Sequence, residues 1–414
     1  MKEPNINLHS GLDKKIILPQ KRIHTSKFNL LDFGRLQILN GRLLVDNQDS
    51  IKQDSIFSTQ FYVDMWGIST YRLKKYTYRE TSFDSIHFLL KNGNYKLPNK
   101  LYRIKYQLIK YSSNEKQLNI DSIVLKSEYP KYEIGKQTGT ETDWFDFNVQ
   151  GICMENIRLN DLLSDSALIS SQIRIKNFAG MAFKDKRLPF PEKPDTKLPM
   201  EMFNSLPLAC HIDSIIVENA DIEYAERVDE SNNAGMVSFN KLSAKIENMS
   251  NIDSLIAAPT TMYVSAKVMN KAILTANFVF PNVKYPGPYR AKGQMGRMQI
   301  ESFNPMLRQN ASIIVKSGEI KQFSFDFQYN NERSDGNLYF EYTNLKIALF
   351  NQSDYKIKTV KSFFVNTIAL HKENLKDNHS FRKGSIAFER DKKKSIFNFW
   401  WKSLLSGIKS IAIL

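Results

Sequence analysis

The feature that most constrains the fold of this chain is a two-residue alternation of apolar and polar side chains. It recurs in short runs rich in Ile, Val, Phe, Tyr and Leu. Residues 324–329 (SFDFQY) and 337–342 (NLYFEY) show it most cleanly, and a turn is predicted over residues 330–336 between them. Because successive side chains of a strand point to opposite faces of its sheet, the alternation predicts strands with one apolar and one solvated face. We therefore predict a mainly β fold, with an elongated, curved antiparallel sheet built from repeated units.

Tight turns are expected to join these strands. Asn40 and Gly41 separate two apolar runs, and an Asn-Gly pair in that position is typical of a β-hairpin. A degenerate Asp-Ser-Ile repeat begins at Asp84, Asp121 and Asp213. Residues 218–224, after the third copy, are interpreted as a turn and another strand, so each repeat predicts a strand, a tight turn and a second strand. Asp and Ser both favour turns and strand ends, so these residues are assigned a structural role.

Helices are expected to be few and short. Helical periodicity occurs near residues 156–166 and 198–206, and the second of these lies in a proline-rich stretch. The predicted organisation is a disordered or incomplete N-terminal segment (1–27), a repeat β-sheet region (28–187), a Pro-rich connector (188–210), a C-terminal β module (211–390) and a basic amphipathic helix (391–414).

The composition narrows the choice of partners. Hydrophobic residues make up 42% of the chain, which is enough for a sizeable core and excludes global disorder. The net charge of +15 would suit an anionic partner, but the basic residues are spread along the chain, whereas nucleic-acid-binding proteins cluster them. Cys153 and Cys210 are too few for a disulfide framework, and their pairing stays open. The opening residues lack the apolar stretch of a secretory signal, and no internal run has the ~20 apolar residues of a membrane span.

Residues that usually carry catalysis or bind metals are not arranged in recognisable patterns. The six histidines form no H-x-x-x-H or Cys/His spacing of a metal site. Cys210 and His211 are adjacent, so a strand would direct them to opposite faces. No Gly-x-Ser-x-Gly motif occurs, and residues 135–140 lack the spacing of a phosphate-binding loop. We therefore predict no catalytic, cofactor-binding or metal-binding residues and no enzymatic activity, although a pair of converging carboxylates stays an alternative.

The last residues of the chain have the pattern of an amphipathic helix. Its apolar side carries Phe397, Trp400, Trp401, Leu404, Leu405, Ile408 and Ala412. Lys402 and Lys409 would make a membrane-spanning helix costly, so a helix that lies in the membrane interface fits better.

We predict that this helix binds a membrane surface. The predicted membrane-binding residues are Phe397, Trp400, Trp401, Leu404 and Ile408, as anchors in the lipid, and Lys392, Lys393 and Lys394, as contacts to lipid phosphates. The alternative is that the helix closes the end of the protein's own sheet and places its aromatic side chains in the core.

Several segments, taken in their order along the chain, resemble one known family. They are residues 303–307 (FNPML), 313–320 (IIVKSGEI), 334–336, 342–345 and 382–390. Together they resemble the closing module of the AsmA-like family of bacterial envelope proteins, in its Bacteroidetes-type versions, where an Asn-Pro pair precedes strands around a Ser-Gly turn. Residues 212–224 resemble the repeat unit before that module. The resemblance covers roughly residues 118–414 and, more weakly, 28–111.

This resemblance implies a fold and a function. AsmA-like proteins are similar to bridge-like lipid-transfer proteins, which are taco-shaped β-sheets whose apolar groove lets phospholipid tails move between membranes. The resemblance implies a non-enzymatic, membrane-associated protein of the periplasm or cell envelope, involved in phospholipid transport or outer-membrane assembly. Phospholipids and a membrane surface are the implied partners, with no nucleic acid and no cofactor. Family members normally begin with an inner-membrane helix, which this sequence does not show.

Two alternatives belong to other classes of protein. The chain could be a structural or interaction module that binds another envelope protein or a glycan, in which case it would purify with a protein and without lipid. It could also be an enzyme that acts on envelope polymers, which would require converging carboxylates or a metal site in a cleft.

Overall fold

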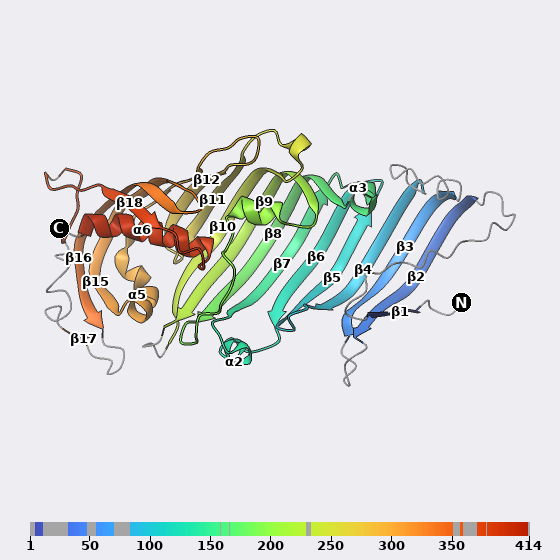
Figure 1. Ribbon diagram of the computed structural model, residues 1–414, viewed down its shortest axis with the longest axis horizontal. Helices are drawn as coiled ribbons and strands as arrows, with labels where there is room; N and C mark the ends of the chain where they lie inside the picture. The colour runs from blue at the N-terminus through green and yellow to red at the C-terminus, as the bar shows by residue number, and fades with distance from the viewer. Residues whose placement is uncertain are drawn as a thin grey trace. The chain divides into compact units, whose positions relative to one another are not determined.

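The computed structural model describes residues 5–10, 32–47, 55–69, 83–157, 159–164, 166–228, 233–350, 357–358, 371–377 and 379–412. The fold is mainly β and antiparallel, with few short helices and a C-terminal helix, as the alternation predicted (Figure 1). The chain divides into two compact units. Unit 1 comprises Met1–Glu128, Asp146–Lys176 and Leu208–Ile212, and unit 2 comprises Tyr129–Phe145, Asn177–Pro207 and Asp213–Leu414.

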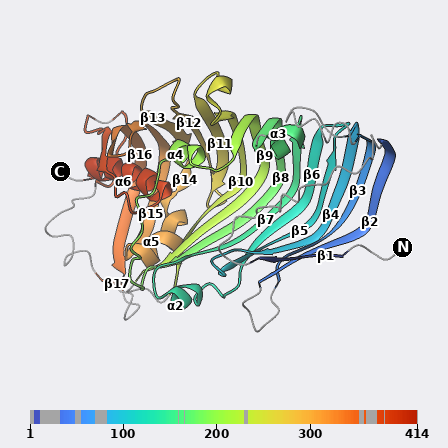
Figure 2. The ribbon, with the colours of Figure 1, turned by 45° about the vertical axis from the view of Figure 1, so that its right-hand side comes forward.

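Unit 1 is a sheet whose neighbouring strands are also neighbours in sequence. Its strands are β1 (Asn5–Ser10), β2 (Asp32–Asn47), β3 (Ser55–Ser69), β4 (Ser85–Lys96), β5 (Tyr102–Ser112), β6 (Gln117–Ser127) and the larger part of β7 (Asp143–Glu155), with the first part of β8 (Ala167–Asp185) and the short helix α3 (Leu159–Ser164). Strands β2 to β7 pair antiparallel in chain order, and β1 pairs in parallel with β2. Figure 2 shows β2 to β6 side by side as a curled sheet.

The strands of unit 2 also pair mainly antiparallel, and helices pack on them. Its strands are the second part of β8, most of β9 (Ala209–Arg227), β10 (Gly235–Ser250), β11 (Thr260–Val268), β12 (Ala272–Phe280), β13 (Tyr289–Met295), β14 (Met298–Gln299), β15 (Ile313–Tyr329), β16 (Arg333–Phe350), β17 (Ile357–Lys358) and β18 (Gly384–Glu389). Its helices are α2 (Ile134–Thr138), α4 (Pro199–Asn204), η1 (Asp253–Leu255), η2 (Ile300–Phe303), α5 (Asn304–Asn310) and α6 (Ile396–Ala412). The two short helices predicted near residues 156–166 and 198–206 are confirmed as α3 and α4.

The predicted hairpin at Asn40 and Gly41 is wrong, because both residues lie inside the continuous strand β2. Asn40 has a positive φ of 53°, and the pairing register with β3 shifts between Ile38 and Gly41. The pair therefore forms a β-bulge. Asn and Gly reach positive φ more easily than other residues, and a bulge uses that freedom as a hairpin turn does.

Two further predicted turns are wrong for the same reason. Residues 218–224 lie within β9, which continues without a break to Arg227. Gly318 lies within β15, at a place where the register with β16 shifts on both sides of Ser317. The Asp-Ser-Ile copies also differ in place, since Asp84 precedes β4 whereas Asp121 and Asp213 lie inside strands. The repeat is thus not a hairpin unit, and the strands are longer than predicted.

Two other features bear on the sequence predictions. Of the predicted N-terminal segment 1–27, residues Asn5–Ser10 form β1 and the others lie outside the described residues. No disulfide joins Cys153 and Cys210.

Candidate functional site

One face of the unit 1 sheet is apolar over two adjacent rows of side chains. Residues directly opposite each other on neighbouring strands point to the same side of a sheet. The first row contains Val63, Phe88, Tyr111, Leu118 and Met154, and the second contains Phe61, Leu90, Ile109, Ile120 and Ile152. On each strand the two rows are two residues apart, so both lie on one face. We call these two rows the apolar face of unit 1.

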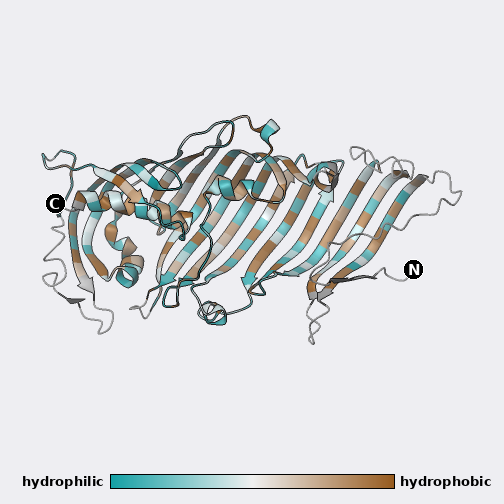
Figure 3. Cartoon of the chain, in the orientation of Figure 1, coloured by the Kyte–Doolittle hydropathy of each residue, from teal (hydrophilic) through white to brown (hydrophobic). Residues whose placement is uncertain are grey.

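The opposite face of these strands is largely polar. One of its rows contains Asp64, His87, Ser112 and Gln117. Arg35 binds Asp64 through two hydrogen bonds of 2.7 and 2.9 Å and also lies 4.4 Å above the ring of Trp66. The hydrogen bonds from Arg35 lower the pKa of Asp64 to about 2, so this carboxylate is charged at neutral pH. Figure 3 shows hydrophobic and hydrophilic positions alternating along the strands.

Each of the two rows of the apolar face is buried at some positions and partly exposed at others. In the first row, Tyr111 is buried, its Oη donates a hydrogen bond to the carbonyl of Ile157 (3.2 Å), and Leu159 of α3 packs on this cluster. In the second row, Ile120 and Ile152 are buried, whereas Phe61, Leu90 and Ile109 remain partly exposed to solvent. An acyl chain along this row would remove apolar surface from water, worth about 0.8 kcal/mol per buried methylene. The part of the second row formed by Phe61, Leu90 and Ile109 is therefore a candidate lipid contact.

A different apolar face lies in unit 2, and helix α6 covers it. One of its rows contains Phe278, Ala291, Phe327, Gly336 and Ile386. Helix α6 packs on β16 and β18 (Figure 1). A Cβ atom at Gly407 would come within 2.9 Å of both Ile386 Cγ1 and Leu338 Cβ, so the helix backbone lies directly against the sheet. A larger residue at position 407 would push the helix outward.

The docking side of α6 has two small residues at its centre and a larger apolar residue at each end. Phe399, Ser403, Gly407 and Ile411 are buried and lie four residues apart, on one side of the helix. The ring of Phe399 lies 5.8 Å from that of Tyr329 and 6.3 Å from that of Phe388. This docking side differs from the predicted apolar stripe, and only the four-residue spacing of the small residues Ser403 and Gly407 could have indicated it.

Three serines of α6 bind the sheet through hydrogen bonds. The hydroxyls of Ser403 and Ser334 are 2.7 Å apart, and both side chains are buried. Ser410 and Ser406 accept hydrogen bonds from the backbone N–H groups of Ser385 (2.7 Å) and Ala387 (3.2 Å). Four residues of helix rise by about 6 Å and two residues of strand by about 6.7 Å, so the serines match the free amides of β18 in spacing. Helix α6 thus protects a strand edge that would otherwise be open to another strand.

The predicted lipid anchors do not share one environment in the structure. Phe397 and Trp401 are 72% and 50% exposed. Trp400 instead packs on the sheet, with its ring 4.7 Å from that of Phe278. Leu404 and Ile408 are half-buried. The outward side of α6 therefore holds only part of the predicted stripe.

The three predicted phosphate contacts each bind another part of unit 2. Lys392 forms an ion pair with Glu332 (2.6 Å), and Lys393 forms one with Asp195 (2.9 Å). The ammonium group of Lys394 lies 3.5 Å from the ring centre of Phe190, in a cation–π contact. Lys393 and Lys394 thus hold the start of α6 against the proline-rich connector, and Lys392 holds it against the turn between β15 and β16.

Arg390 strengthens the same connection and was not predicted. Its buried guanidinium donates hydrogen bonds to the Asn331 side chain and to the Thr196 carbonyl. The backbone N–H of Thr196 in turn donates to the carbonyl of Lys392 (2.7 Å). Burial lowers the pKa of Arg390. We call these contacts between residues 190–196 and residues 390–394 the clasp.

A largely buried carboxylate, that of Glu226, joins three segments of unit 2. Glu226, on β9, accepts hydrogen bonds from Lys186 (2.6 Å), Tyr224 (2.7 Å) and Asn310 of α5 (2.7 Å). Burial alone would raise the pKa of Glu226, but the charge of Lys186 and these hydrogen bonds outweigh it and hold the pKa below its ordinary value. Burial, followed by the charge of Glu226, raises the pKa of Tyr224. Because Lys186, Tyr224 and Asn310 together bind the Glu226 carboxylate, we assign this arrangement a structural role.

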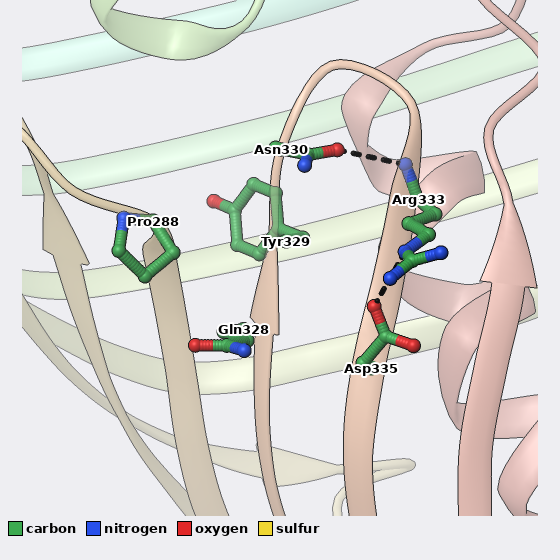
Figure 4. Close-up of a pocket in the computed structure, with 6 residues that line it drawn as sticks. All are labelled: Pro288, Gln328, Tyr329, Asn330, Arg333 and Asp335. Atoms are coloured by element: carbon green, nitrogen blue, oxygen red, sulfur yellow. Dashed lines mark hydrogen bonds and ion pairs between the residues drawn. The ribbon is translucent and has the colours of Figure 1, made fainter.

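The pocket at the turn between β15 and β16 is small. It has a volume of about 130 Å³ and is lined by Pro288, Gln328, Tyr329, Asn330, Arg333 and Asp335 (Figure 4). Asn330 Oδ1 accepts a hydrogen bond from the Arg333 backbone N–H (2.9 Å), and the Arg333 side chain forms an ion pair with Asp335 (3.0 Å). Ligand sites for drug-sized molecules measure about 300–1,000 Å³. This pocket is too small for a phospholipid.

Three further observations concern metal binding, membrane spans and related proteins. Among the described residues, His, Cys, Asp and Glu side chains form no group of three or more that could hold a metal ion. None of the helices in the described part of the chain has the length and apolar character to cross a membrane. No protein-family model and no curated protein matches this chain.

Proposed function

We propose that this chain is a non-enzymatic cell-envelope protein that binds phospholipid acyl chains on the apolar face of unit 1. In this role it takes part in phospholipid transport or outer-membrane assembly. The observation that carries the proposal is the second row of that face, in which Phe61, Leu90 and Ile109 are apolar, aligned across neighbouring strands and partly exposed. Such a row suits acyl chains because their binding needs apolar area and no specific polar partner.

The resemblance to the AsmA-like family supports the same proposal. It motivates the periplasmic, membrane-associated location and the phospholipid as the ligand. A long antiparallel sheet is the fold that this resemblance implies, and the strands of the chain pair in such a sheet.

Lipid extraction followed by mass spectrometry tests the proposal most directly. The protein is purified gently from the membrane fraction of its host, and bound phospholipids are counted per chain. We expect phospholipids at a stoichiometric level that decreases on mild detergent washing. A lipid-free protein that purifies with another envelope protein would contradict the proposal and favour an interaction module.

The outward side of α6 is proposed as the contact with the membrane surface. We expect the double variant Phe397→Ser and Trp401→Ser to bind anionic vesicles at least about tenfold more weakly, because two large apolar side chains can no longer enter the lipid. The measurement is vesicle co-sedimentation. A matched control is Val283→Ser with Tyr285→Ser, since these side chains are also exposed (65% and 42%) but lie in a loop of unit 2. Equal binding by wild type and the α6 variant would rule out this contact.

A further inference from the structure

Helix α6 presents much of its apolar surface away from the sheet that it covers. Phe397 and Trp401 point outward, whereas Ser403 and Gly407 lie against the sheet. An amphipathic helix is usually most stable when its apolar side is the buried one. In the docked position of α6 that condition is met only in part, because two of its largest side chains remain in water.

All the apolar side chains of the stripe could enter a membrane only if α6 left the sheet. Trp400 belongs to that stripe, but its ring packs on Phe278, and Leu404 is half-buried. Docked α6 can therefore place Phe397 and Trp401 in lipid, but not the remainder of the stripe. The sheet and a bilayer thus compete for the same helix.

The charges beside the stripe favour an anionic bilayer as the competing partner. Lys402 and Lys409 are both exposed on α6, and the described residues of this helix include no acidic side chain. Basic residues that flank an apolar helix face are attracted to anionic lipid headgroups. The residues of the clasp, among them Lys393 with its ion pair to Asp195, lie before the helix, so the clasp can stay closed while α6 moves.

Departure of α6 would expose two features of unit 2. One is the apolar row that includes Phe278, Phe327 and Ile386, and the other is the pair of β18 amides at Ser385 and Ala387. The row is apolar and spans several strands, as the apolar face of unit 1 does. It would therefore offer acyl chains a second surface.

We infer that α6 is a displaceable cap, which an anionic bilayer draws off the sheet of unit 2 so that the row beneath it accepts acyl chains. The identity of the ligand rests on the proposed function. The movement of the helix does not, because it is inferred from the packing and the charges of α6.

Ser334 and Ser403 allow a direct test, since their hydroxyls are 2.7 Å apart. Cysteines at these positions, in a Cys153→Ser and Cys210→Ser background, should form a disulfide that locks α6 on the sheet. We expect the oxidised protein to bind vesicles of phosphatidylglycerol and phosphatidylcholine at least about tenfold more weakly than the same protein after reduction, since Trp400 and Leu404 cannot enter the lipid. The control is Ser403→Cys alone in the same background, which should not respond to reduction.

Gly407→Ala should have the opposite effect to the disulfide, because it should make α6 leave the sheet more easily. Its Cβ would lie too close to Ile386 and Leu338, which weakens docking, while alanine favours the helix itself. We expect this variant to bind the same vesicles several-fold more tightly than wild type. Gly296→Ala is the control, because a Cβ there meets only the Ile273 carbonyl, at 3.9 Å. If the engineered disulfide does not form, vesicle binding by Gly407→Ala still tests whether α6 is a displaceable cap.

A phospholipid with a photoreactive acyl chain separates this inference from the proposed function. We expect labelling of β12 and β15 in the reduced protein and its loss in the oxidised protein, with labelling of unit 1 unchanged. Equal vesicle binding by oxidised and reduced protein, or unchanged binding by Gly407→Ala, would contradict the inference that α6 is a displaceable cap. Absence of labelling in unit 1 in every form would instead overturn the proposed function, while the vesicle measurements would still decide the movement of α6.

Discussion

Replacing Ile109 by aspartate should abolish phospholipid binding by unit 1. Ile109 occupies the middle of the second row of the apolar face, between Leu90 and Ile120, and is partly exposed. A carboxylate at this position would have to lose its hydration wherever an acyl chain crosses it, and no cation lies beside it in that row. We expect the affinity for phospholipid to decrease by at least about 100-fold, which corresponds to roughly 2.7 kcal/mol.

Leu108→Asp is the matched control for this prediction. Leu108 is the preceding residue on β5, is also half-buried and lies opposite Lys91 on the other face of the sheet. Both variants introduce the same charge into the same strand, although only the carboxylate at position 108 lies opposite a lysine, Lys91. Phospholipid binding is measured by extraction and mass spectrometry, and folding is monitored by circular dichroism. Equal loss of lipid in the two folded variants would show that the apolar face is not the binding surface.

The fold class could be predicted from the sequence because alternation reports directly on the two faces of a sheet. Residues 324–329 alternate, and in β15 Phe325, Phe327 and Tyr329 are indeed buried, whereas Asp326 and Gln328 are exposed. The lengths of the strands could not be predicted. Asn40 and Gly318 were interpreted as turn residues, yet they lie at irregularities inside long strands. A bulge and a hairpin turn draw on the same backbone freedom, so only the pairing of distant strands decides between them.

The candidate site was predicted in part for a comparable reason. The periodicity of residues 396–412 identified the helix, and its exposed Phe397 and Trp401 belong to the predicted stripe. The periodicity could not show that the sheet would bind the side with Ser403 and Gly407, because that choice depends on the close approach of Gly407 to Ile386. The apolar face of unit 1 could not be assigned to particular residues either, since it requires the register of neighbouring strands.

Removal of the Glu226 carboxylate should destabilise unit 2 more than any loss of an exposed ion pair. The Glu226 side chain is 14% exposed and accepts hydrogen bonds from Lys186, Tyr224 and Asn310. Glu226→Ala leaves three donors without their acceptor and separates β9 from α5. We expect the free energy of unfolding to decrease by about 3 kcal/mol, as is typical when one partner of a largely buried ion pair is lost. The measurement is urea-induced unfolding followed by tryptophan fluorescence.

The pH dependence of this effect distinguishes a charged from a neutral role of Glu226. Because its folded-state pKa lies below the ordinary value of 4.5, its stabilising contribution is complete at neutral pH and decreases as the pH falls below 4.5. The difference in unfolding free energy between wild type and Glu226→Gln should therefore shrink in acid. Glu247→Gln is the control, since Glu247 and Lys245 form an exposed pair that should contribute less than about 1 kcal/mol. A difference that stays constant from neutral to acidic pH would mean that Glu226 acts through its hydrogen bonds alone, without its charge.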